Sequence, residues 1–233
     1  MTTLFKNGYR AMVIGASGAI GQAFVSALQA DASCTYVKSV SRSAINGFDL
    51  LDSASIEAQA AASAGSGPYH LIVDASGVLT IDGVGPEKSL AAVQPDILAK
   101  AFQLNAIGPL VLLRHFSALL APGASIYAKL SARVGSISDN RKGGWYSYRA
   151  SKAALNMLLQ TAAIELQRTQ PELRVVALQP GTVRSNLSKP FTSTAPHLLE
   201  PAESVSGMLA AMQCLARTHG AHFIDYKGTP VNW

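Results

Sequence analysis

The sequence predicts a single α/β domain, residues 1–233, built on one parallel β-sheet with helices on both faces. Three observations lead to this fold class. Short apolar runs alternate with helical stretches of roughly ten or more residues along the whole chain, as in βαβ units. The 233 residues suffice for one sizeable core. A glycine-rich turn joins the first apolar run to the first helical stretch, which is typical of a doubly wound, Rossmann-like sheet.

Strands are expected where apolar residues run together before a turn, and helices where apolar residues recur three and four positions apart. Ser53 is a candidate N-cap of the second helix, and Gly65 is a stop signal for it. The irregular stretch 186–200 is a candidate lid over the substrate. The strands are expected within residues 10–18, 35–42, 69–77, 123–133, 173–181 and 222–226, and the helices within 19–30, 53–65, 95–120, 151–168 and 202–217.

Hydrophobic residues make up 48% of the chain and charged residues 14%, which is the composition of a folded globular protein. The apolar runs are shorter than the roughly 18 residues of a membrane span, so none is expected. The first residues lack the pattern of a signal peptide, so a cytoplasmic location is expected. Cys34 and Cys214 are too few for a disulfide framework or a cysteine-based metal site.

The net charge of +5 comes from scattered lysines and arginines, without a basic block or interleaved aromatic residues. This pattern argues against a nucleic-acid partner, and a basic balance suits a phosphorylated cofactor. The five histidines do not fall at metal-ligand spacings with other donors, so no metal site is expected.

The glycine-rich turn reads GASGAIG and places Gly15, Gly18 and Gly21 three residues apart. Glycine permits a tight turn and a close approach of the backbone to a pyrophosphate, and the following helix presents free N–H groups. The turn therefore predicts a dinucleotide site. The alternative is a packing turn without a ligand.

The end of the second strand bears on the choice of dinucleotide. An acidic residue near this point bonds the ribose hydroxyls of NAD, but this chain has Ser41 and Arg42. A guanidinium and a hydroxyl would hold a 2′-phosphate that a carboxylate would repel. The sequence therefore favours NADP over NAD, unless Arg42 is a solvated surface residue. Asp49 and Leu50 are expected to line the adenine.

Tyr148 and Lys152 are four residues apart at the start of a predicted helix, so their side chains share one face. A nearby ammonium favours the phenolate and lowers the pKa of a tyrosine, which can then exchange a proton with a carbonyl oxygen. Tyr146 lies off that face, so the spacing selects Tyr148 as the acid/base. The alternative for Tyr148 is simple packing at a helix start.

Several motifs together resemble the short-chain dehydrogenase/reductase family. They are the glycine turn, DASG at 74–77, LNAIGP at 104–109, YRASK at 148–152 and QPGTVRS at 179–185. They follow the family's order and cover essentially the whole chain. The segments SARVGSISDN and HFIDYKGTPVNW are similar to the branch related to the C-factor signalling protein of bacteria.

The resemblance implies a role for each matching position. Tyr148 would be the proton donor, Lys152 would bond the nicotinamide ribose, and Asn105 would anchor a water that relays protons to Lys152. Members of this family are commonly homodimers or homotetramers. The expected cofactor-binding residues are Gly15, Ser17, Gly18, Ile20, Gly21, Ser41, Arg42, Asp49, Leu50, Ala75, Ser76, Gly77, Asn105, Tyr148, Lys152, Pro180, Gly181 and Val183.

The chain departs from the family pattern at two places. Its Gly-x-x-Gly-x-x-Gly spacing is more like the branch with sugar epimerases and dehydratases, although the chain is too short for the substrate region of that branch. The position of the family's catalytic serine, three residues before Gly135, holds Ala132. Ser131 is the first candidate for the hydroxyl that stabilises the carbonyl oxygen, and Ser136 is the alternative.

The function predicted from these residues is the NADPH-dependent reduction of a carbonyl compound, or the oxidation of the corresponding alcohol, by hydride transfer. The alternative is a nucleotide-binding signalling or interaction protein with little turnover. An epimerase or dehydratase is a third interpretation, which rests on the glycine spacing alone.

Overall fold

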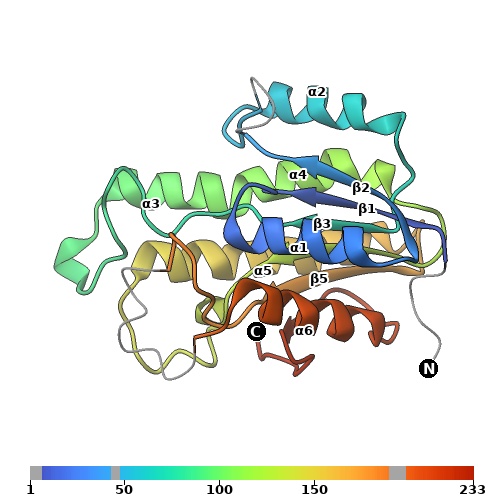
Figure 1. The fold of residues 1–233 in the computed structure, drawn as a ribbon. Coiled ribbons are helices and arrows are strands. Elements are labelled where there is room, and N and C mark those ends of the chain that lie inside the picture. Colours follow the sequence, from blue (N-terminus) through green and yellow to red (C-terminus); the bar gives the residue numbers. More distant parts are fainter. Residues whose placement is uncertain (1–6, 43–47, 189–197) are drawn as a thin grey trace.

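The computed structural model describes residues 7–42, 48–188 and 198–233, and its centre is one six-stranded parallel sheet (Figure 1). The strand order is β2-β1-β3-β4-β5-β6, so the chain moves outward in opposite directions from β1 and β3. Ligands of such sheets bind beyond the carboxyl ends of the strands at this reversal. The strands are β1 (Tyr9–Ile14), β2 (Cys34–Val40), β3 (Leu71–Asp74), β4 (Ser125–Leu130), β5 (Leu173–Gln179) and β6 (His222–Asp225).

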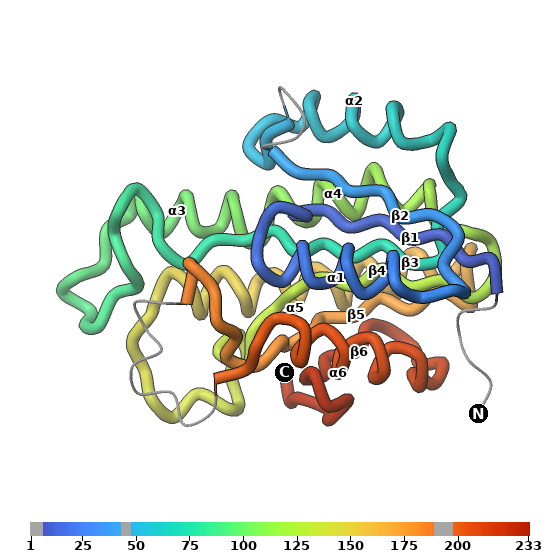
Figure 2. The backbone as a smooth tube through the Cα atoms, in the orientation of Figure 1, coloured from blue at the N-terminus to red at the C-terminus, as the bar shows by residue number. Residues whose placement is uncertain are grey.

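Helices cover both faces of the sheet, as Figures 1 and 2 show. The helices α1 and α6 pack side by side on one face and enclose one apolar core. The other face carries α2, α4 and α5 over a second core. The helices are α1 (Ala19–Ala30), α2 (Ser53–Ala64), α3 (Pro95–Phe102), α4 (Gly108–Phe116), α5 (Tyr146–Leu166) and α6 (Pro201–Gln213), with a π-helical turn at Gln103–Ile107 between α3 and α4.

The doubly wound parallel sheet predicted from the sequence is confirmed, and all six strands lie where they were expected to within one residue, since β1 and β2 each begin one residue early. Every residue of β3 and β4 is buried, because helices cover a central parallel strand on both sides. Three details differ from the prediction. The helix expected at 151–168 begins earlier, at Tyr146. The long helix expected at 95–120 is interrupted by the π-helical turn.

The third difference is the cap of α2. The N-cap is Asp52 and not Ser53, because the Asp52 carboxylate accepts the N–H of Ala54 at 2.9 Å. Gly65 is the C-cap, in agreement with the prediction. Serine and aspartate are both favoured N-caps, so residue type does not distinguish Asp52 from Ser53. The N-cap is the residue whose backbone is not helical, and this is Asp52.

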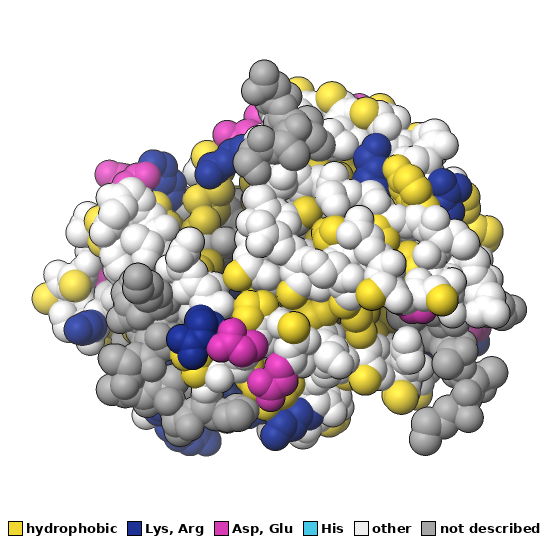
Figure 3. Space-filling model, viewed as in Figure 1, with side chains coloured by type: hydrophobic (Ala, Val, Ile, Leu, Met, Phe, Trp, Pro, Cys, Tyr) yellow, Lys and Arg dark blue, Asp and Glu magenta, His cyan; other side chains and the backbone are white. Residues whose placement is uncertain are grey.

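The helical stretch Pro95–Leu119 is long and apolar enough to cross a membrane by length and composition alone. Core helices of folded domains have the same length and composition, and part of this stretch, α4, packs on the sheet core. On the face that carries α1 and α6, the charged side chains drawn in colour stand singly or in small groups of mixed sign (Figure 3).

Candidate functional site

The glycine turn connects β1 to α1 at the carboxyl edge of the sheet. Gly15 has a φ of +77°, and a Cβ there would lie 2.9 Å from backbone atoms of Ala75 and Ser76. A Cβ at Gly21 would lie 2.2 Å from the carbonyl oxygen of Gly15. Only glycine therefore lets this turn fold tightly and touch the turn that follows β3.

Gly18 differs from the other two glycines, because within the described part of the chain a Cβ there would meet only the Gly15 oxygen, at 3.5 Å. Gly18 is the N-cap of α1, which has no side-chain cap and no acidic residue in its first turn. The open space and the uncapped helix N-terminus fit a phosphate-bearing cofactor, since the first N–H groups of a helix attract anions. Ser17 and Ile20 belong to the same turn.

The end of β2 brings Ser41 and Arg42 to the same edge of the sheet. Ser41 is buried and Arg42 is exposed. Asp49 is exposed and accepts the N–H of Leu51 at 3.0 Å. Leu50 packs against the start of α4, where a Cβ on Gly108 would lie 3.2 Å from the Leu50 Cβ. Residues 43–47, between Arg42 and Asp49, lie outside the described part of the chain.

The turn after β3, residues 74–77, has a backbone that buried polar groups hold in place. Asp74 accepts the N–H of Ser76 at 2.9 Å. Lys129 of β4 donates to the Ser76 carbonyl oxygen at 2.6 Å and to its hydroxyl at 2.9 Å. Gly77 has a φ of +141°, and a Cβ there would lie 3.5 Å from Lys152 Nζ. The turn thus lies between β4 and α5 and contacts both.

Asn105 is fully buried within the π-helical turn. Its side chain bonds both backbone groups of Val78, accepting from the N–H at 2.9 Å and donating to the oxygen at 3.0 Å. Its amide also donates to the Ser151 hydroxyl at 3.3 Å. Asn105 therefore joins the turn after β3 to α5. The π-helical turn was missed in the sequence, as its residues continue the same apolar periodicity as the helices around it, although such turns are frequent at functional sites.

Tyr148 and Lys152 lie one turn apart in α5, with Lys152 Nζ 5.7 Å from the centre of the Tyr148 ring. Lys152 is buried and donates to the Leu130 oxygen at 3.1 Å. Burial lowers the pKa of Lys152 to about 7, with a further contribution from the Lys129 charge and an opposing one from Asp74. Tyr146 is more exposed than either, at 38%.

The pKa of Tyr148 does not follow the prediction. Burial raises it to about 12, whereas the spacing to Lys152 predicted a lower value. Removing the phenol from water disfavours its charged form, and Lys152 with a pKa near 7 carries only part of a positive charge at neutral pH.

The serine expected to accompany Tyr148 is turned away from it. The Ser131 hydroxyl is buried and donates to Asn156 Oδ1 at 2.6 Å. Because successive residues of an extended chain point in opposite directions, Ala132 faces the other way. A Cβ on Gly135 would lie 2.9 Å from the Lys152 backbone, so the 132–135 turn is held against α5.

The Ser136 hydroxyl is buried as well and accepts the N–H of Asp139 at 3.1 Å. Among the described residues, no hydrogen bond links Ser131 or Ser136 to the Tyr148 hydroxyl. The Ser131 hydroxyl thus already has a partner in Asn156, and the choice between Ser131 and Ser136 as the catalytic hydroxyl stays a prediction.

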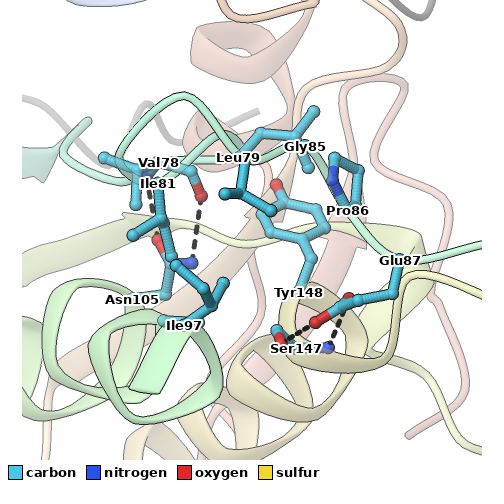
Figure 4. A pocket seen from close by; sticks show the side chains of 12 residues that line it. Val78, Leu79, Ile81, Gly85, Pro86, Glu87, Ile97, Asn105, Ser147 and Tyr148 are labelled. Carbon is cyan, nitrogen blue, oxygen red and sulfur yellow. Dashed lines mark hydrogen bonds between the residues drawn. The ribbon is translucent and has the colours of Figure 1, made fainter. Parts of the chain in front are cut away.

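A pocket beside Tyr148 contains a carboxylate that the sequence did not single out (Figure 4). Glu87 is 5% exposed, and its two oxygens accept the N–H of Ser147, at 3.1 Å, and the Ser147 hydroxyl. Burial raises the pKa of Glu87, but the hydrogen bonds from Ser147 outweigh burial and hold that pKa below its usual value. No local signal could have found this contact, which spans 60 residues.

Trp145, directly before α5, has a φ of +55° and follows two glycines with φ of +63° and +64°. Its N–H donates to the Glu87 carbonyl oxygen at 2.5 Å. Its ring meets the edge of the Tyr148 ring, with centres 6.1 Å apart. Glu87 and Trp145 together define where the helix that carries Tyr148 begins.

The loop after β5 supplies the remaining expected residues. Pro180 accepts the Ser204 hydroxyl at 2.6 Å, and Gly181 has a φ of +81°. Val183 is buried and pairs with Leu199. Residues 189–197 of the candidate lid, 186–200, lie outside the described part of the chain. Within the described part, no group of three or more His, Cys, Asp or Glu side chains could hold a metal ion.

The sequence and the fold were each compared with those of known proteins. Residues 39–196 match the family model described as short chain dehydrogenase. The chain is 35% identical over 170 residues to the C-signal of Myxococcus xanthus, which covers 72% of this chain and 95% of that protein. It is 30% identical over 188 residues to a 1-hydroxy-2-glutathionyl-2-methyl-3-butene dehydrogenase of Rhodococcus sp. (strain AD45), covering 80% of this chain and 79% of that one.

The fold is similar to that of NADPH-bound carbonyl reductase from chicken fatty liver, with a TM-score of 0.82 and 22% identity. The superposition covers 98% of this chain and 95% of that chain. At this level of identity, the likeness concerns the fold.

Proposed function

Because this chain belongs to the short chain dehydrogenase family, an oxidoreductase family, we propose that it reduces a carbonyl compound with NADPH, or oxidises the corresponding alcohol, with Tyr148 as the proton donor. The observation that carries this proposal is the placement of Tyr148 and Lys152 one turn apart on α5, beside the turn 74–77. A small-molecule carbonyl or alcohol is thus the partner.

The proton chemistry follows from the environment of these two side chains. Bound NADPH supplies the hydride. The Tyr148 hydroxyl gives its proton to the carbonyl oxygen; with a pKa raised to about 12 by burial, the phenol holds that proton at neutral pH until it is needed. Lys152, with a pKa lowered to about 7 by burial, exchanges protons readily near neutrality and can return one to Tyr148. A protonated phenol is the form that acts as an acid when a carbonyl is reduced.

The preference for NADPH over NADH rests on the end of β2. Arg42 is exposed there, close in sequence to the buried Ser41, and a guanidinium suits a 2′-phosphate. The open space at Gly18 and the uncapped start of α1 suit the pyrophosphate. Ala75, Ser76 and Gly77 border the same edge, where β1 and β3 end.

The role of Tyr148 can be tested with a pair of matched substitutions. NADPH consumption is measured on a panel of aldehydes, ketones and quinones for wild type, Tyr148→Phe and Tyr146→Phe. We expect Tyr148→Phe to lose about a hundredfold or more of its turnover, the range for one acid/base group. Tyr146→Phe, which alters a more exposed neighbour, should retain activity. Equal turnover in wild type and Tyr148→Phe would refute the role.

A second candidate function is a nucleotide-binding signalling or interaction protein with little turnover. Ala132, at the position of the family's serine, and the 35% identity to the C-signal protein favour it. Calorimetry and the same substrate panel separate the two functions. Tight NADPH binding without turnover on any substrate would select the second.

A further inference from the structure

Two buried charges lie side by side in the sheet, next to the proposed site. Asp74 is the last residue of β3 and pairs in register with Lys129 of β4. Both side chains are fully buried, and Lys129 Nζ lies 3.0 Å from Asp74 Oδ1. Removing two charges from water is costly, and packed apolar residues often replace such pairs without loss of stability. This pair therefore calls for a role other than general stability.

The bonds of Lys129 indicate what that role is. Its other two acceptors, at 2.6 and 2.9 Å, are the oxygen and the hydroxyl of Ser76. Asp74 in turn accepts the Ser76 hydroxyl at 2.5 Å and the Ser76 N–H at 2.9 Å. Among the described residues, the side-chain hydrogen bonds that the pair makes outside itself thus all go to Ser76, within the turn 74–77.

The opposite side of this turn meets α5. The Cβ that Gly77 lacks would lie 3.3 Å from Asn105 Oδ1 and 3.5 Å from Lys152 Nζ. Asn105 also holds the next residue, Val78, through both of its backbone groups. A displacement of Ser76 would therefore carry Gly77 toward or away from the Lys152 ammonium.

We propose that Lys129 is a positioning residue that, together with Asp74, anchors the turn 74–77 and thereby sets the place of Lys152. This inference rests on the proposed function, in which Lys152 serves Tyr148. Lys129 contacts neither Tyr148 nor Lys152 through a hydrogen bond among the described residues, so its effect is exerted through the turn and through its field.

The charges near Lys152 agree with this role. Lys129 on β4 and Asp74 on β3 face it from the sheet, and Tyr148 faces it from its own helix. Burial is the main cause of the lowered Lys152 pKa, repulsion by Lys129 adds to it, and Asp74 opposes it more weakly. Removing the pair should therefore raise the pKa of Lys152. Tyr127, two residues before Lys129, is a further titratable group close to Asp74.

The test replaces both charges with neutral groups of similar shape, Asp74→Asn/Lys129→Met, so that no lone charge stays buried. The matched control is Asp82→Asn/Lys100→Met, which removes an exposed ion pair. The Asp82 side chain is 59% exposed and the Lys100 side chain is 43% exposed. NADPH affinity is measured by titration without substrate, and kcat is measured against pH for each protein.

We expect the buried double variant to bind NADPH about tenfold more weakly, which corresponds to about 1.4 kcal/mol, with the Lys152 limb of its pH profile moved to higher pH. The surface double variant should match wild type in both. Ser76→Ala, which removes one of the three Lys129 bonds and keeps the ion pair, should change NADPH affinity in the same direction by less. If the buried double variant does not fold, the NADPH affinity of Ser76→Ala serves as the test of the inference.

The inference is overturned if the buried double variant has unchanged NADPH affinity and an unchanged pH profile. If the buried double variant does not fold, unchanged NADPH affinity in Ser76→Ala overturns it. These results are distinct from a failure of the proposed function. If Tyr148→Phe keeps full turnover, the acid role of Tyr148 is wrong, whereas the titration with NADPH still reports on the anchored turn.

Discussion

At the scale of single residues, a polar side chain in this site is available for catalysis only if its hydrogen-bonding atoms are not already paired within the protein. Ser131 illustrates this, because its hydroxyl is bound to Asn156 and its neighbour Ala132 has no hydroxyl to offer. Tyr148 and Lys152 illustrate the effect of burial, which raises the pKa of one and lowers that of the other. Both effects depend on three-dimensional surroundings, which the residue types alone do not determine.

Ala132→Ser tests whether the site lacks a hydroxyl. Since Ser131 faces Asn156, Ala132 points the other way, and a serine there would restore the hydroxyl that the family pattern has at this position. One donor to a developing oxyanion is worth about a hundredfold or more in a preorganised site, so an increase in kcat of several-fold is expected. Steady-state kinetics with the best substrate of the panel measure it. An unchanged kcat in a normally folded variant would mean that another group fills this role.

Arg42→Asp tests the choice of cofactor. A carboxylate in place of the exposed guanidinium should repel a 2′-phosphate and accept the ribose hydroxyls of NADH. The ratio of kcat/KM for NADPH to that for NADH is expected to fall by about tenfold or more, as for the loss of one charged hydrogen bond. The control is Arg168→Asp, an exposed residue just after the C-terminal end of α5, which should leave the ratio unchanged. A constant ratio in Arg42→Asp contradicts the preference for NADPH.

At the scale of elements, the start of α5 decides where Tyr148 stands. Three successive left-handed residues, Gly143, Gly144 and Trp145, turn the chain into the helix. This conformation is uncommon for an aromatic residue, and Glu87 holds it through the N–H groups of Trp145 and Ser147. The sequence predicted a helix here but not its first residue, because the groups that start it come from a distant loop.

Glu87→Ala should loosen this helix start. It removes two hydrogen bonds to a buried carboxylate and leaves the Ser147 hydroxyl without its acceptor. Bonds to charged groups contribute about 1.5–3 kcal/mol each, so a lower melting temperature and a lower kcat are expected together. Thermal unfolding and kinetics measure them. Glu87→Gln, which keeps the shape and one acceptor, should recover most of both. A melting temperature in Glu87→Ala equal to that of wild type would contradict the capping role.

At the scale of the whole molecule, two large apolar side chains are exposed on the π-helical turn and on α5. Ile107 is 51% exposed and Met157 is 66% exposed, and the two lie on neighbouring elements, the π-helical turn and α5. We propose that this surface joins copies of the chain into the homodimer or homotetramer that the family resemblance implies.

Met157→Glu should weaken that association, because it places a charge in an interface that would otherwise be apolar. Light scattering coupled to size exclusion is expected to show an oligomer for wild type and a smaller species for the variant. Ile137→Glu, which changes a 79% exposed residue elsewhere, is the control and should stay oligomeric. A monomeric wild type would contradict the proposed assembly.

The sequence by itself determined the six strands, the approximate positions of the helices, the glycine turn and the four-residue step from Tyr148 to Lys152. Each of these depends on local periodicity or on spacing within one element, which the order of residues encodes directly. Only the tertiary structure decided the orientation of Ser131, the capping of α5 by Glu87, the Asp74–Lys129 pair and the direction of the Tyr148 pKa shift. These features join residues far apart in the chain, so they depend on strand order, register and burial, which arise only once the sheet has formed.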